Sequence, residues 1–368
     1  MIKSNKKPNQ AHNALCASVK FPSELRMDLI SKDWVVIATG RAKRPEMFKE
    51  EKDKTEEISQ SKCPFCQIQD QEKPTLIFVR GKEVNQNKGI PKNWTTIVVP
   101  NKFPAFIPNS KLEKKLEGRF YQKMNAVGFH EVVVTKNHRK SLGQFNVKEF
   151  KEVIDVYQER YLELMKKKFV SYVSIFHNHK QGAGATISHP HSQIITTPLI
   201  DIDLKNALLN SEKYYKKTKK CIYCQMNSWE KNAKTRLIFE NKEFMAVCPF
   251  ASKSAFEIIV SPKKHLPYFE KITEKEKWLL AEVFRAALHK LYKGLNNPAY
   301  NFYLHTAPCD GVKPRGGHAT LRGKKYEHYH WHWTILPKTS TWAGFELGAR
   351  MEISTIEPEK AAEYLRKQ

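Results

Sequence analysis

Hydrophobic and polar residues alternate along the chain in short runs that predict β-strands, and two longer stretches show the period of amphipathic helices. These helical stretches cover residues 147–168 and 273–295, and a last helix is predicted to begin at Pro358. Because the runs are spaced like hairpins and do not alternate strictly with helices, the pattern predicts an α+β fold with an antiparallel sheet. The predicted strands are 34–38, 94–100, 130–135, 172–178, 192–198, 256–262, 300–306 and 329–337.

The order of these features repeats. Each half of the chain contains a CxxC pair, a strand, a second strand that leads into a turn and a histidine, a long helix, another strand, and a strand opened by an HxH sequence. Six matches in the same order indicate a duplicated domain. We therefore predict a loose N-terminal tail (1–22), a first domain (23–205) and a second domain (206–368), with the boundary in the polar stretch near residues 200–215.

Composition narrows the class of protein. Hydrophobic residues make up 40% of the chain, which is enough for packed cores, and no apolar run is long enough to predict a membrane span. The polar N-terminus lacks the apolar segment of a secretory signal, so we expect a cytoplasmic protein. The formal charge of +25 suits an anionic partner such as a phosphorylated small molecule, although lysine-rich surface runs account for much of it.

Four of the seven cysteines form the two CxxC pairs, and an odd count without a secretory signal argues against a disulfide scaffold. A CxxC pair alone could be a redox dithiol or half of a metal site. The repeat favours metal, because it follows each pair with two histidines, and Cys2His2 completes the tetrahedral shell of a structural zinc ion. His328 competes with His330 in the second set. The predicted Zn²⁺ ligands are Cys63, Cys66, His138 and His189, and then Cys221, Cys224, His265 and His330.

The sequence HPHSQ, residues 189–193, suggests a catalytic strand. If His189 binds zinc, the two-residue period of a strand places His191 and Gln193 on the same face. A neutral imidazole is a competent nucleophile toward phosphorus, and a glutamine amide can donate to a phosphoryl oxygen. The second HxH is followed by Trp333 and Thr334 and lacks the glutamine, so we interpret it as a structural copy.

HPHSQI and the preceding IFHNHKQGAGATIS resemble the active-site signature of the galactose-1-phosphate uridylyltransferase branch of the histidine-triad superfamily. RAKRP (41–45), VPNKFPAF (99–106) and residues 342–366 resemble further motifs of that family, so the resemblance runs from about Arg26 to Arg366. It implies two duplicated histidine-triad-like domains, each an antiparallel half-barrel packed with helices. It also implies ping-pong transfer, in which His191 attacks a UDP-hexose, releases hexose 1-phosphate and carries UMP.

The resemblance also implies the substrate contacts and a homodimer in which the sugar phosphate is bound across the interface. Gln193 would stabilise the nucleotidylated histidine, and the partners would be a nucleotide sugar and a hexose 1-phosphate or phosphate. The substrate-binding residues implied in this way are Arg41, Arg44, Asn101, Lys102, Asn178, Gly184, Ala185, Thr186, Gly344, Phe345 and Glu346.

Two departures keep the substrate open. The family often has HPHGQ where this chain has Ser192, and the second CxxC replaces a different metal site. Both features resemble the ADP-glucose phosphorylase group, which transfers adenylyl to phosphate. An alternative of another class is a zinc-stabilised, basic nucleic-acid-binding protein, but the wide separation of cysteines from histidines is unlike compact zinc fingers. A degenerate relative that binds nucleotides without turnover is disfavoured by the presence of His191 and Gln193.

Overall fold

The computed structural model describes residues 23–38, 44–49, 58–310, 314–315, 318–319 and 324–368. Its main feature is an eleven-stranded sheet in the order β11-β12-β13-β17-β14-β9-β10-β8-β5-β3-β4, in which all neighbours are antiparallel. These strands are β3 (Leu76–Val79), β4 (Lys82–Glu83), β5 (Thr96–Pro100), β8 (His130–Thr135), β9 (Tyr172–His179), β10 (His191–Thr197), β11 (Leu237–Glu240), β12 (Phe244–Val247), β13 (Ile258–Pro262), β14 (Tyr300–His305) and β17 (His332–Pro337).

The sheet shows the duplication directly. From its centre outward, β9-β10-β8-β5-β3 in the first half matches β14-β17-β13-β12-β11 in the second. The halves join where β9 pairs with β14, with Asn178 opposite Asn301. The predicted α+β fold with antiparallel pairing is confirmed, and the two half-sheets form one continuous sheet. The boundary at 205/206 falls inside helix α3 (Ile202–Thr218), so no extended linker marks the predicted division there.

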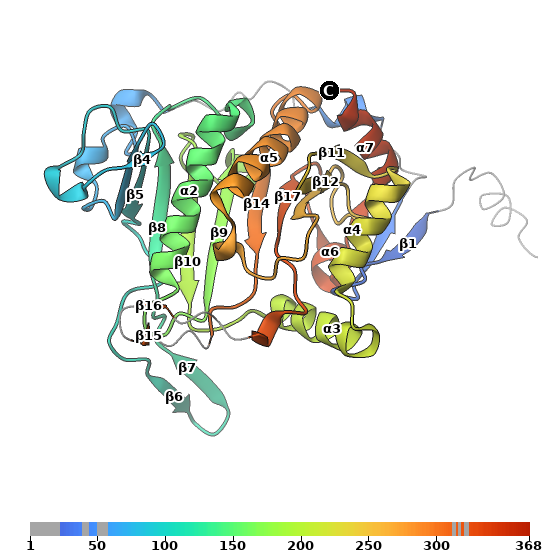
Figure 1. Cartoon of the computed structure of the whole chain (residues 1–368), viewed down its shortest axis with the longest axis horizontal. Coiled ribbons are helices and arrows are strands. Elements are labelled where there is room, and N and C mark those ends of the chain that lie inside the picture. Colours follow the sequence, from blue (N-terminus) through green and yellow to red (C-terminus); the bar gives the residue numbers. More distant parts are fainter. Residues whose placement is uncertain (1–22, 39–43, 50–57, 311–313, 316–317, 320–323) are drawn as a thin grey trace, which may run out of the picture.

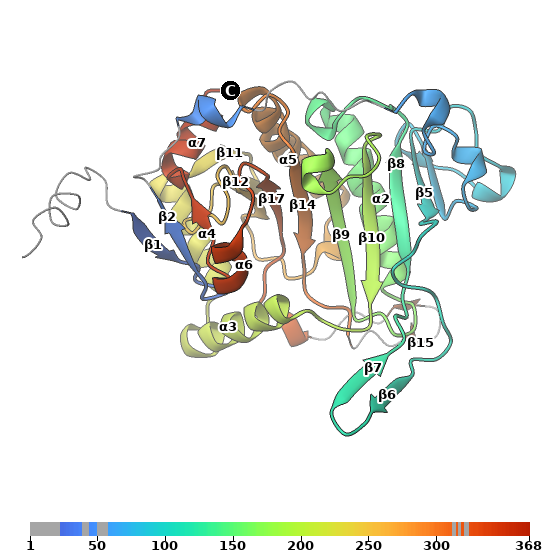
Figure 2. The ribbon, with the colours of Figure 1, turned by 180° about the vertical axis from the view of Figure 1, so that it is seen from behind.

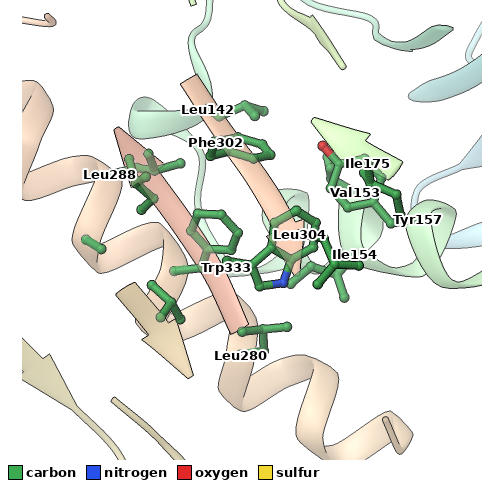
Figure 3. Packing of buried hydrophobic residues seen from close by; sticks show 14 of the residues in the cluster. Leu142, Val153, Ile154, Tyr157, Ile175, Leu280, Leu288, Phe302, Leu304 and Trp333 are labelled. Atoms are coloured by element: carbon green, nitrogen blue, oxygen red, sulfur yellow. The ribbon is translucent and has the colours of Figure 1, made fainter. Parts of the chain in front are cut away.

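Helices α2 (Val147–Leu164) and α5 (Glu274–Gly294) cover one face of the sheet and lie against each other (Figure 1). Each begins with a capping box, formed by Asn146 and Glu149 in α2 and by Thr273 and Glu276 in α5. Figure 3 shows the core between these helices and the central strands, where Tyr157, Phe302 and Trp333 pack together. Trp333 is fully buried. The opposite face of the sheet, here called the distal face, is seen in Figure 2.

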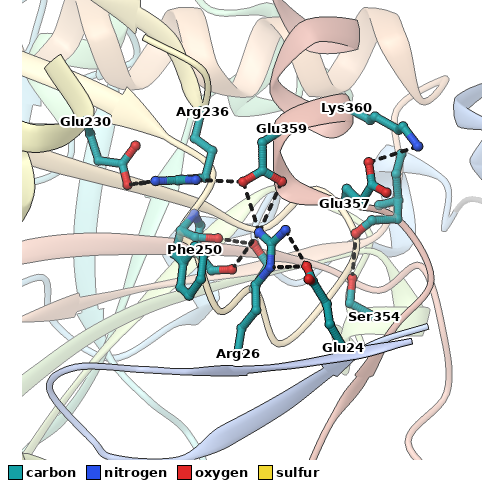
Figure 4. Close-up of polar contacts among 12 residues, drawn as sticks. Glu24, Arg26, Glu230, Arg236, Phe250, Ser354, Glu357, Glu359 and Lys360 are labelled. Atoms are coloured by element: carbon teal, nitrogen blue, oxygen red, sulfur yellow. Dashed lines mark hydrogen bonds and ion pairs between the residues drawn. The ribbon is translucent and has the colours of Figure 1, made fainter. Parts of the chain in front are cut away.

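Smaller elements surround the sheet. A three-stranded sheet of β1, β2 and β18 brings the N-terminal and C-terminal segments together, and Figure 4 shows Arg26 and Arg236 on either side of the Glu359 carboxylate beside it. Within the described residues, no helix is long and apolar enough to cross a membrane. The remaining elements are β1 (Glu24–Met27), β2 (Trp34–Ile37), β6 (Lys114–Glu117), β7 (Tyr121–Met124), β15 (Pro314–Arg315), β16 (His318–Ala319), β18 (Ile353–Ser354), α4 (Ile222–Ala233), α6 (Gly344–Ala349) and α7 (Pro358–Arg366).

Candidate active site and metal centres

The first predicted metal group is assembled from three separate segments. Cys66 Sγ lies 3.2 Å from His138 Nδ1 and 3.5 Å from His189 Nδ1, and Cys63 Sγ lies 3.5 Å from His189 Nδ1. Cysteine sulfur at about 2.3 Å and histidine nitrogen at about 2.1 Å from a tetrahedral zinc ion are about 3.5 Å apart. The spacing of these donors therefore fits zinc.

The histidine rings of this group are also turned correctly. His138 Nε2 is 2.9 Å from the Ile58 carbonyl oxygen, and His189 Nε2 is 2.7 Å from that of Thr135. An Nε2–H that donates to a carbonyl leaves the Nδ1 lone pair facing the sulfurs, as a ligand histidine requires. The group is largely buried, with only Cys66 partly accessible.

The second group repeats this geometry closer to the surface. Cys224 Sγ lies 3.5 Å from the Nδ1 atoms of both His265 and His330. The ligand atoms of Cys221, Cys224, His265 and His330 all lie within 4.8 Å of one another. The structure thus brings His330 into the group and not its competitor His328. His265 is exposed, which distinguishes this group from the first.

Strand β10 carries the predicted nucleophile. His191 lies on the distal face, because its neighbour Ser192 faces α2, where its Oγ is 2.5 Å from the Tyr157 hydroxyl. His191 Nδ1 lies 2.9 Å from the His189 carbonyl oxygen and donates to it, so Nε2 is free as a lone pair. Burial lowers the pKa of His191, which keeps the ring neutral near pH 7. The Phe65 ring packs against it at 4.9 Å. The arrangement presents a neutral, oriented nitrogen nucleophile.

Gln193 lies on the distal face two residues further along β10. Its Oε1 is 2.8 Å from Nε2 of His130, the first residue of β8. Asn101 Nδ2 lies 3.0 Å from the same ring nitrogen, so the structure brings this predicted substrate-binding residue close to Gln193. His130 was not predicted from sequence. Asn101 and His130 also line a cavity of about 740 Å³, together with Phe106 and with Glu159 and Arg160 of α2.

Asn178 on β9 faces the same side of the sheet as His191. Its Oδ1 accepts a 2.8 Å hydrogen bond from Asn301 Nδ2, which also donates to the Ala183 carbonyl over 2.8 Å. Asn301 comes from the second half and, like His130, was not predicted from sequence. It fixes both Asn178 and the loop that follows β9. In that loop Gly184 takes a positive φ of 89°, which glycine accommodates without strain.

The other predicted substrate residues divide into three groups. The N–H groups of Gly184 and Ala185 are engaged within their own loop, whereas Thr186 is exposed. Arg44 and Lys102 are exposed, and Arg41 lies outside the described residues. The third group, Gly344, Phe345 and Glu346, lies on α6. Figures 1 and 2 both place α6 over the second half, away from β10, so the structure does not bring these residues to His191 within one chain.

Comparison with known proteins agrees with this fold and site. The profile of the galactose-1-phosphate uridyl transferase N-terminal domain matches residues 17–201, and a domain of unknown function, DUF4921, matches residues 124–368. The first match covers half of the chain. The chain therefore belongs to the galactose-1-phosphate uridyl transferase family.

The individual relatives include both an ADP-glucose phosphorylase and galactose-1-phosphate uridylyltransferases. An ADP-glucose phosphorylase from Arabidopsis thaliana is 29% identical over 93% of this chain and 92% of its own length. A galactose-1-phosphate uridylyltransferase from Thermotoga maritima is 24% identical over 93% of this chain and 98% of its own. The crystal structure of an A. thaliana ADP-glucose phosphorylase with bound ADP-glucose has a TM-score of 0.75 at 26% identity, covering 94% of this chain and 99% of that chain. The relation to the ADP-glucose phosphorylase group is thus shown together with the family.

Proposed function

We propose that the protein is a nucleotidyltransferase that acts on a nucleotide sugar through a covalent nucleotidyl-His191 intermediate. The observation that carries the proposal is the His191 ring, with Nδ1–H held by the His189 carbonyl and Nε2 free on the distal face. Nε2 would attack the α-phosphorus and form a P–N bond, while the P–O bond to the hexose 1-phosphate breaks. Attack by a phosphoryl oxygen of the acceptor would then restore free His191.

The family resemblance of the sequence motifs gives priority to a UDP-hexose as the donor. Two observations now favour ADP-glucose and a phosphate acceptor: the higher identity to an ADP-glucose phosphorylase, and the second Cys2His2 group, in which all four predicted donors meet. ADP-glucose is therefore the first donor to test. UDP-glucose is the second donor to test, because the matching family profile and the Thermotoga maritima relative are both named as uridylyl transferases.

Positioning in this site comes mainly from the chain's own amides. We propose that the side-chain amides of Gln193, Asn178 and Asn101 donate to phosphoryl and ribose oxygens. Gln193 and Asn178 lie on the distal face with His191, and Asn101 lies beside the His130 ring that contacts Gln193. The two Cys2His2 groups would hold structural zinc ions, since four protein donors close each shell. The first of them supports His191 through His189 and Phe65.

The α6 segment would complete the site from a second copy of the chain. Phe345 is 51% exposed, and α6 lies away from β10 in its own chain. A homodimer that places α6 of one copy over His191 of the other would give these residues the sugar-phosphate role that the family resemblance implies. Sedimentation analysis would test the dimer.

The test of the proposed function is covalent labelling. Protein incubated with α-³²P-labelled ADP-glucose or UDP-glucose should retain acid-labile, base-stable label, and the preferred donor identifies the base. His191→Ala should retain none, whereas His289→Ala, a change on the outer helix α5, should label like wild type. Absence of label on wild type with both donors would refute the proposal. Adding phosphate or a hexose 1-phosphate to the labelled protein then identifies the acceptor that discharges it.

A further inference from the structure

We infer that His130 is a positioning residue that fixes the orientation of the Gln193 amide, so that the amide nitrogen faces the phosphoryl group on His191. The inference rests on the proposed function and adds a residue to it. His130 begins β8 and Gln193 lies on the neighbouring β10, where Ile195 is the direct partner of His130. The two side chains meet on the distal face, with 2.8 Å between His130 Nε2 and Gln193 Oε1.

The hydrogen-bond pattern around His130 determines where its proton lies. The backbone N–H of Ala105 donates to His130 Nδ1 over 3.1 Å, so Nδ1 is the acceptor of the ring. A neutral imidazole carries one proton, which must then be on Nε2. The ring therefore offers a single donor toward the two amides that approach it.

Only one of those amides can accept this proton. Asn101 Oδ1 already accepts from the Phe103 backbone N–H over 2.9 Å, and it is the Asn101 nitrogen that faces the ring. Gln193 Oε1 is thus the acceptor for His130 Nε2–H. A side-chain amide whose oxygen is held in this way has its nitrogen on the opposite side. In Gln193 that nitrogen is left to donate to a ligand, which is the orientation that stabilising a nucleotidylated histidine requires.

The same ring connects two parts of the site. Through Nδ1 it holds the Ala105 backbone in the loop after β5, where Asn101 lies, and through Nε2 it holds Gln193 on the catalytic strand. Without His130, the Gln193 side chain would be free to rotate its amide by 180°. That rotation would point an oxygen lone pair at a phosphoryl oxygen, a repulsive contact where the transition state needs a donor.

The test is a double-substitution cycle on the rate of nucleotidylation in a single turnover at saturating donor. His130→Phe keeps the ring volume and removes both nitrogens, and it should slow nucleotidylation by roughly tenfold, the effect of about 1.4 kcal/mol. In the Gln193→Ala background the same change should cause less than a twofold further loss, because His130 acts through Gln193. His130→Gln, which restores a donor near the Nε2 position, should recover part of the rate. Multiplicative losses in the double variant would overturn the inference.

A second measurement does not depend on activity. ¹⁵N NMR of the histidine side chains should show His130 with its proton on Nε2, assigned by the signal lost in His130→Phe. A proton on Nδ1 would overturn the inference whether or not the protein transfers nucleotides. If neither donor labels wild type, the proposed function fails, and the tautomer still decides the His130–Gln193 hydrogen bond. His289→Ala is the control variant for both measurements.

Discussion

Ser192 interrupts the HPHGQ sequence common in the family, and the structure predicts that this difference affects stability and not substrate choice. Its side chain points away from the distal face, with Oγ 2.5 Å from the Tyr157 hydroxyl and 3.1 Å from His177 Nδ1. All three residues are buried. The perturbation to make is Ser192→Ala, which removes the hydroxyl between two polar groups that have no access to water.

The magnitude follows from what the change leaves behind. Each neutral hydrogen bond contributes about 1 kcal/mol, and an unpaired buried polar group costs about 1–3 kcal/mol. Losing both contacts of Ser192 and leaving the Tyr157 hydroxyl without this partner should lower the free energy of unfolding by about 3 kcal/mol. Ser192→Gly should cost about 1 kcal/mol more, because glycine weakens a strand interior. Tyr157→Phe should cost about 1 kcal/mol.

The assay is urea unfolding of the metal-loaded protein, followed by circular dichroism. Since Ser192 and Tyr157 share a contact, the double variant Ser192→Ala/Tyr157→Phe should lose less than the sum of the single losses, by about 1 kcal/mol or more. Ser211→Ala is the matched control, because Ser211 is also buried and its hydroxyl donates to the Leu208 carbonyl of its own helix. Wild-type stability in Ser192→Ala, or a changed preference between ADP-glucose and UDP-glucose, would refute the reasoning.

Three further changes test other parts of the structure. Glu359→Gln weakens the contacts that join Arg26 at 3.0 Å and Arg236 at 2.6 Å, so the free energy of unfolding should fall by about 2 kcal/mol in urea titrations. A chromophoric chelator should remove metal in two phases, the faster one from the group that contains the exposed His265, and a single phase in wild type would contradict this. Burial raises the pKa of Glu257 to about 7, so its contribution to stability is full below pH 4.5 and is lost as pH rises to 7. Relative to Glu257→Gln, wild type should therefore lose up to about 3 kcal/mol across that range, and parallel pH profiles would exclude this contribution.

The metal groups could be predicted from sequence because their chemistry restricts the residue types. Cysteines and histidines at repeated positions can be recognised in the sequence before the fold is known. Each of the eight predicted donors lies in a group with the expected partners. The relation of His191 to Gln193 was also predictable, because it needs only the two-residue period of one strand. The same period places Ser192 on the opposite face, and its structural role follows from that orientation.

The two amide-fixing residues could not be predicted in this way. His130 is 63 residues from Gln193 along the chain, and Asn301 is 123 residues from Asn178. Their roles depend on which strands pair and in what register. The periodicity of a single strand gives information on neither the pairing nor the register. The only local signal was a histidine at the start of the apolar run 130–135, which is a weak indication without a partner. Helix α3 was missed for a related reason, since its mostly polar surface resembles a linker in composition.

His332 in the second half of the chain is the counterpart of His191 in the first. His332 Nδ1 lies 3.3 Å from the His330 carbonyl oxygen, and the corresponding distance from His191 Nδ1 to the His189 carbonyl is 2.9 Å. The Tyr223 ring packs against His332 at 5.6 Å, in the place that Phe65 takes beside His191 at 4.9 Å. The orientation of the ring is thus retained.

The surroundings of that ring differ. His305 occupies the strand position opposite His332 and stacks on it at 4.7 Å, and Thr334 replaces the glutamine. Burial lowers the pKa of His332 to about 4. A phosphoryl group at His332 would therefore meet the His305 ring and Thr334 where the first half has Asn178 and Gln193. The metal group and the HxH turn, which hold the histidine in place, occur in both halves. Gln193 and Asn178 of the first half correspond to Thr334 and His305 in the second, so the proposed nucleotidyl transfer is expected at His191 and not at His332.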